Sequence, residues 1–157
     1  MATLTGTLTV NAAFLQEIKV DNVLLRHLLG ELRDVSTPAP VLRNHSTRFV
    51  VLLGELRDQL ALHFALEEAY GYFEDAIDIA PRLADRANHL RTQHTTLFET
   101  IRELSDAAAE LAEPHSWQSL SSLGLAFAEF DVQLREHEAD ETQLIFEVFD
   151  QDIGVGD

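Results

Sequence analysis

The chain of 157 residues contains no cysteine, few basic residues and no long apolar run. Without cysteine it cannot form disulfides, thiolate metal sites, iron–sulfur clusters or cysteine nucleophiles. Lysine and arginine together number 11 against 27 acidic residues, which gives a formal net charge of −16. So acidic a surface repels nucleic-acid backbones and anionic lipids, and neither is expected as a partner.

We expect no segment that directs the protein to or across a membrane. Its start, MATLTGTLTV, carries no basic residue, which argues against a secretory signal. No stretch approaches the roughly 18 uninterrupted apolar residues of a membrane span. We therefore expect a cytoplasmic protein. Hydrophobic residues make up 46 %, which is too many for a disordered acidic tail and predicts one globular domain over residues 1–157.

Proline and glycine are scarce, and they divide the chain into four long segments. The four prolines, at positions 38, 40, 81 and 114, stand between stretches rich in alanine, leucine, glutamate and arginine, which favour helix. The alternation typical of strands is absent. The breaks predict an all-α fold, an up-down-up-down antiparallel four-helix bundle. The expected helices cover about residues 11–34, 41–74, 81–112 and 117–149, followed by a loose tail at Gly154 and Gly156.

Each predicted helix has an apolar face at helical spacing. On the first helix we expect Phe14, Ile18, Leu25, Leu28 and Leu32 to point inward, with Val20, Leu24 and His27 widening the face. The faces of the other three helices are apolar except at one place each. The residues that interrupt them are His63 and Glu67, His94, and His137 and Glu141.

These interruptions predict a metal centre. An ionised carboxylate buried without a partner costs several kcal/mol or shifts its pKa until it is neutral. A pair of divalent or trivalent metal ions neutralises two carboxylates and accepts lone pairs from neutral imidazoles. His63 and Glu67 are four residues apart, as are His137 and Glu141, so each pair points to one spot on its helix. His27 joins them if the first helix is shifted along its axis.

The ordered set of residues resembles the hemerythrin-like family, also called the HHE cation-binding domain, over about residues 11–149. The family pattern is one histidine on the first helix, His-x-x-x-Glu on the second, one or two histidines on the third, and a histidine followed by an acid on the fourth. The chain is similar to the four-His, two-Glu variety. The resemblance implies two iron ions bridged by an oxo or hydroxo group and held by His27, His63, Glu67, His94, His137 and Glu141.

The resemblance also implies a function at that centre. We expect a non-haem di-iron protein that binds dioxygen or another small oxidant, or that senses redox or iron state. Oxygen carriers of the family have a further histidine where this chain has Leu90, and an aspartate where it has Thr142. An enzyme that reduces peroxide or nitric oxide is therefore an alternative, and a metal-free helical interaction module is another.

Several other side chains are alternatives at or near the expected site. His89 faces elsewhere unless a π-bulge intervenes. Glu31 forms a second His-x-x-x-Glu with His27 and is interpreted as a rim residue. Tyr70 lies one turn beyond Glu67, either lining the pocket or standing at the core edge. His45 stands about 27 Å from His63 along a continuous helix, too far to share its site. The remaining candidates are assigned to solvated surfaces: Glu68, Glu138, Asp140 and His115.

Overall fold

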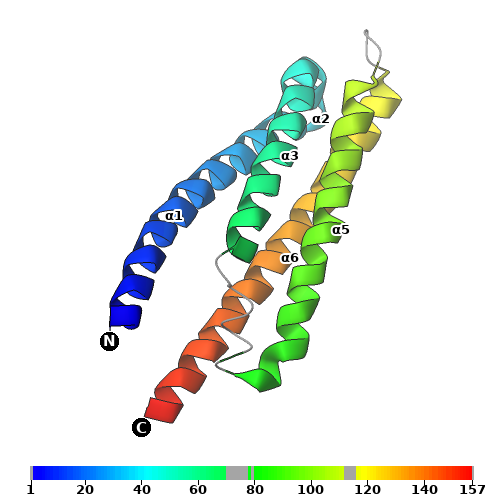
Figure 1. Cartoon of the computed structure of the whole chain (residues 1–157). Coiled ribbons are helices and arrows are strands. Elements are labelled where there is room, and N and C mark those ends of the chain that lie inside the picture. Colours follow the sequence, from blue (N-terminus) through cyan, green and yellow to red (C-terminus); the bar gives the residue numbers. More distant parts are fainter. Residues whose placement is uncertain (1, 70–77, 79, 112–115, 157) are drawn as a thin grey trace.

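The computed structural model describes residues 2–69, 78, 80–111 and 116–156, with side chains for 19–69, 78, 80–111 and 116–148. The described residues contain helices and no strand, which confirms the all-α prediction. Figure 1 shows four long helices and a short one, α2. The elements are α1 (Ala2–Ser36), α2 (Ala39–Asn44), α3 (Ser46–Ala69), the 3₁₀ turn η1 (Pro81–Leu83), α5 (Ala84–Ala109) and α6 (Trp117–Gly156).

The helix bounds differ from the predicted ones in four places. The segment expected as one helix from residue 41 is divided, because His45 has non-helical dihedral angles (φ −122°, ψ 28°) between α2 and α3. α6 continues through Gly154, where a loose tail was expected, since one more helical hydrogen bond per residue offsets a glycine cost of about 1 kcal/mol. α1 begins nine residues before Asn11, and α5 ends at Ala109, three residues before the predicted end at residue 112. The predicted end at residue 74 lies outside the described residues.

The long helices pack in chain order, α1 against α3, α3 against α5, and α5 against α6. Leucine and phenylalanine side chains fill the space between them. The rings of Phe49 and Phe127 pack edge to face, with 6.0 Å between their centroids. The apolar faces predicted for the second, third and fourth helices are confirmed. Their inward-facing positions are buried, from Phe49 on α3 to Leu144 on α6. Within the described residues, no helix is both long and apolar enough to cross a membrane.

The inward face of α1 differs from the predicted one. Val20 and Leu24 are each 51 % exposed, and His27 is exposed as well. Leu25 and Leu32 are buried as predicted, and Leu28 is half-buried against the core. Asp21, Leu29 and Ser36 complete the buried face, so His27 stands outside it. The side chains of Phe14 and Ile18 lie outside the described set.

Candidate metal centre

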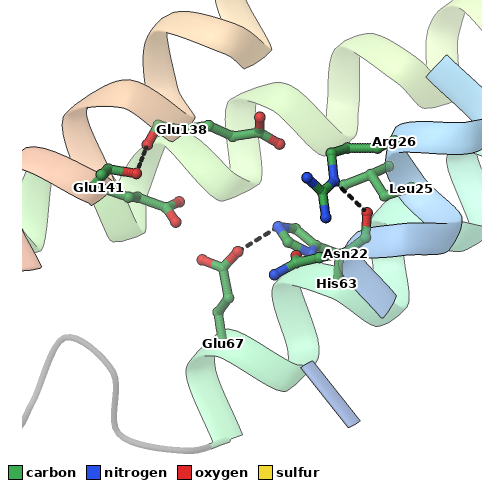
Figure 2. Close-up of a pocket in the computed structure, with 8 residues that line it drawn as sticks. Asn22, Leu25, Arg26, His63, Glu67, Glu138 and Glu141 are labelled. Carbon is green, nitrogen blue, oxygen red and sulfur yellow. Dashed lines mark hydrogen bonds and ion pairs between the residues drawn. The ribbon is translucent and has the colours of Figure 1, made fainter. Parts of the chain in front are cut away.

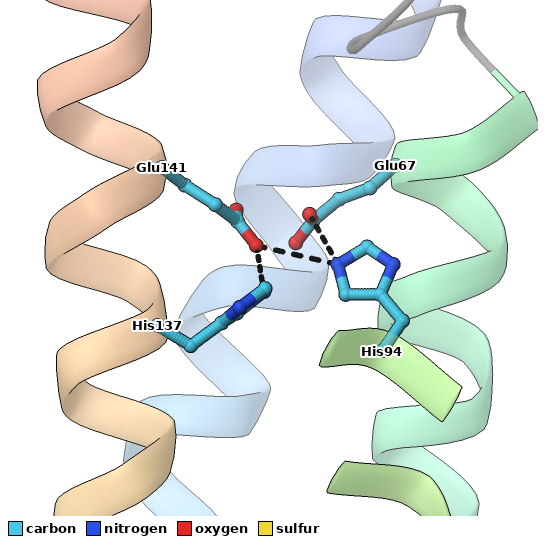
Figure 3. Close-up of side chains that lie close together, drawn as sticks. All are labelled: Glu67, His94, His137 and Glu141. Carbon is cyan, nitrogen blue, oxygen red and sulfur yellow. Dashed lines mark hydrogen bonds and ion pairs between the residues drawn. The ribbon is translucent and has the colours of Figure 1, made fainter. Parts of the chain in front are cut away.

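Five side chains from three helices meet in the interior at one level. α3 supplies His63 and Glu67, α5 supplies His94, and α6 supplies His137 and Glu141. All five are buried, between 3 % and 6 % exposed. Four of them, all except His63, carry ligand atoms that lie within 4.8 Å of one another (Figure 3). We call these the four-residue group.

The two carboxylates connect the three imidazoles. Glu67 Oε1 contacts His63 Nε2, and Glu67 Oε2 lies 3.4 Å from His94 Nε2. Glu141 Oε1 contacts His137 Nε2 and lies 3.3 Å from the same His94 nitrogen. Each imidazole therefore presents Nε2 to a carboxylate, and His94 faces both carboxylates.

A second set of polar side chains surrounds the imidazoles from outside. The Nδ1 of each ring has an oxygen partner, which leaves Nε2 facing inward. Such outer partners fix the orientation of imidazoles at metal sites and raise their basicity. The Nδ1 contacts are His63 to Asp21 Oδ2 at 2.5 Å, His94 to Glu68 Oε1 at 3.3 Å and His137 to Gln93 Oε1 at 2.7 Å.

Electrostatics in the metal-free cluster favour charged imidazoles. Burial by itself would lower the pKa of His63, but its contacts with Glu67 and Asp21 outweigh burial and raise the pKa to about 9. Burial likewise opposes charge on His94, and the contacts with Glu141 and Glu67 raise its pKa to about 9. Burial would raise the pKa of Glu67, but hydrogen bonds from the same imidazoles lower it. In the metal-free protein, the protons on His63 and His94 therefore balance the negative charge of the carboxylates, which a metal cation could balance instead.

Two buried atoms of the cluster, Glu67 Oε2 and His137 Nε2, make no well-formed hydrogen bond. Each has only an ion-pair neighbour, His94 Nε2 for the first and Glu141 Oε1 for the second. Both atoms offer lone pairs toward the centre of the four-residue group (Figure 3). Two imidazoles and two carboxylates suit iron, manganese or zinc. The residues present therefore fit a bound metal.

The structure does not bring His27 to this cluster. Its exposed side chain lines a separate groove between α1 and α3. At the level of the cluster α1 instead presents Asp21, which the sequence reasoning missed. The signal was available, because Asp21 precedes Leu25 and Leu29 at four-residue spacing. A carboxylate therefore interrupts this apolar face as Glu67 interrupts that of α3.

The alternative residues are placed as follows. His89 is exposed and contacts Gln93 rather than the cluster. Glu31 forms an ion pair with Arg48 at 2.7 Å. Glu68 is exposed, as expected, yet it reaches the Nδ1 of His94. His45 and Asp140 are exposed, Glu138 is half-buried, and Tyr70 and His115 lie outside the described residues.

A cavity of about 350 Å³ opens beside the cluster, between α1, α3 and α6 (Figure 2). It reaches His63 and both bridging carboxylates, whereas His94 and His137 do not line it. Burial raises the pKa of Glu138 on its wall. Small polar molecules can therefore approach one side of the cluster. The lining residues are Asn22, Leu25, Arg26, His63, Glu67, Glu138, Glu141 and Thr142.

The described residues are helical, and their buried imidazoles are joined by carboxylates. These features place the chain among helical domains with a candidate metal site in the interior. The family model described as hemerythrin HHE cation binding domain matches residues 13–149, and the chain belongs to this family. No curated protein and no solved structure matches the chain. Family membership and the buried cluster agree on metal binding.

Proposed function

We propose that this chain is a non-haem di-iron protein that binds dioxygen or another small oxidant, within an up-down-up-down four-helix bundle. One observation carries the proposal. Two carboxylates and three imidazoles converge in an apolar interior, where two of their atoms make no well-formed hydrogen bond. The chain directions of the four long helices in Figure 1 support the bundle topology.

The proposed ligands divide by chemistry. Glu67 and Glu141 lie between imidazoles on different helices, so both carboxylates would help to hold the cations and balance their charge. His63, His94 and His137 supply one Nε2 each, held in place by their Nδ1 partners. An iron pair, when bound, supplies redox chemistry toward small oxidants. Leucine and phenylalanine side chains pack around these ligands, and cavities reach the cluster at His63 and, between α3 and α5, at His94.

The first test is metal content combined with absorption. The protein is expressed with saturating iron, and iron per chain is measured together with the near-ultraviolet spectrum in air and under reductant. We expect about two iron ions per chain and an absorption band that reductant removes. His94→Ala should lose most of the iron, whereas His45→Ala, which changes an exposed histidine of the same chain, should retain it. A wild-type protein without bound iron would contradict the proposal.

A second candidate function is reduction of peroxide at the same centre, and the polar cavity favours it. Arg26, Asn22 and Thr142 offer hydrogen-bond donors beside the cluster. Polarity, donors and access near an iron decide between binding a small oxidant and activating it. Mixing the reduced, iron-loaded protein with one equivalent of hydrogen peroxide separates these functions. Loss of peroxide matched by oxidation of the centre indicates reduction, and an unchanged spectrum with no peroxide loss excludes it.

A further inference from the structure

The two sides of the cluster are not equivalent in their ligands. On the side of α5 and α6, the four-residue group brings two imidazoles and two carboxylates within 4.8 Å of one another. On the side of α1, His63 is the imidazole present, and it shares Glu67 with the other side. His27 does not complete this side, because it is exposed and lines another groove.

The residues of α1 that reach this side are Asp21 and Asn22. Both oxygens of Asp21 are already engaged, Oδ2 with His63 Nδ1 at 2.5 Å and Oδ1 with Gln59 Nε2 at 2.6 Å. Asn22 lines the cavity together with His63 and Glu67, and Figure 2 shows its side chain extending from α1 into this space. Among the α1 residues that line this cavity, Asn22, Leu25 and Arg26, only Asn22 has a side-chain oxygen that can accept a cation.

We propose that the centre has two unequal cation positions, and this proposal rests on the metal binding proposed above. The four-residue group forms the tight position. The weak position is formed by His63, Glu67 and the amide oxygen of Asn22, and it faces the cavity.

Ligand chemistry and charge both explain the difference. A neutral amide oxygen is a poorer donor to first-row transition metals than an imidazole. Arg26, which lines the same cavity, adds a positive charge that opposes a cation at the weak position. Of the four-residue group, Glu67 and Glu141 line this cavity but His94 and His137 do not, so the imidazoles of the tight position stand farther from Arg26.

The test is a titration of the metal-free full chain with Co²⁺. Calorimetry and the visible absorption of the ion measure how much Co²⁺ binds and how tightly. We expect one tight equivalent and a second that binds at least about ten-fold more weakly. Asn22→His offers an imidazole at the same point of α1, and it should tighten the second equivalent about ten-fold or more without changing the first. Asn22→Asp, which has nearly the same size, should also tighten the second.

Controls separate this proposal from the proposed function. His27→Ala should leave both equivalents unchanged, and His94→Ala should weaken the first. Circular dichroism confirms that each variant is folded. Two equivalents of equal affinity in the wild-type chain, or a second equivalent that neither Asn22 variant tightens, would overturn the proposal of unequal positions. Absence of any Co²⁺ binding would instead overturn the metal centre itself.

Discussion

His63 and Asp21 join α3 to α1 through a buried contact of 2.5 Å between imidazole Nδ1 and carboxylate Oδ2. Asp21 is only 3 % exposed, and its other oxygen accepts a hydrogen bond from Gln59. The contact leaves His63 Nε2 facing Glu67. One aspartate thus connects two helices and orients one imidazole of the candidate metal centre.

Asp21→Ala should weaken metal binding at the His63 side and destabilise the fold. The change leaves the donors of His63 and Gln59 without their acceptor, at a cost of about 1–3 kcal/mol. Loss of such an outer partner lowers metal affinity about 10–100-fold. Urea denaturation and Co²⁺ titration measure the two effects. Asp34→Ala, at an exposed position of the same helix, is the control and should change neither. Equal metal affinity in both variants would show that Asp21 does not orient His63.

The metal-free protein should lose stability as pH rises from about 6.5 to 9. The folded-state pKa values of His63 and His94 are raised to about 9, above the usual 6.5, so the folded state binds more protons in this window. Their stabilising contribution is fully present below pH 6.5 and is lost as pH rises through 9. Thermal unfolding in the presence of a chelator measures this. A double variant, His63→Gln with His94→Gln, should flatten the dependence, and an equally steep dependence in that variant would contradict the assignment.

Arg33→Ala should destabilise the protein by about 1–3 kcal/mol. Arg33 forms two hydrogen bonds of 2.7 and 2.8 Å with Asp131, which is buried on α6. The variant leaves Arg135, at 3.4 Å, as the ion-pair partner of that carboxylate among the described side chains. Arg48→Ala breaks the exposed pair with Glu31, which water screens, and should cost less than Arg33→Ala. Urea denaturation compares them, and equal losses would show that burial of Asp131 does not matter.

Two helical glycines should respond in opposite ways to alanine. At Gly30 a Cβ meets no atom within 4 Å, so Gly30→Ala should stabilise α1 by about 0.5–1 kcal/mol. At Gly124 a Cβ would lie 2.9 Å from Leu42 Cδ2, and Leu42 is buried. Gly124→Ala therefore forces α2 and α6 to adjust and should lower the melting temperature. A similar rise in melting temperature for both variants would show that Leu42 moves freely.

The apolar faces of three helices could be predicted from the sequence because each has one clear apolar stripe. Burial of Phe49, Leu97 and Leu134 follows from that pattern, and so does burial of the histidines and glutamates that interrupt it. On α1 the pattern is ambiguous. Apolar residues occupy positions 20, 23, 24, 25, 28 and 29, which surround the helix, so periodicity does not select one face.

The sequence alone determined that five ionisable side chains must share one level of an apolar interior, because their spacing and their apolar neighbours leave no other inward face for them. Tertiary packing decided what the first helix contributes. Its rotation against α3 and α6 buries Asp21 and turns His27 to the surface, which depends on contacts between residues distant in the chain. Packing likewise decided that the cavity opens on the His63 side, since the shape of a space between three helices is set by their relative positions.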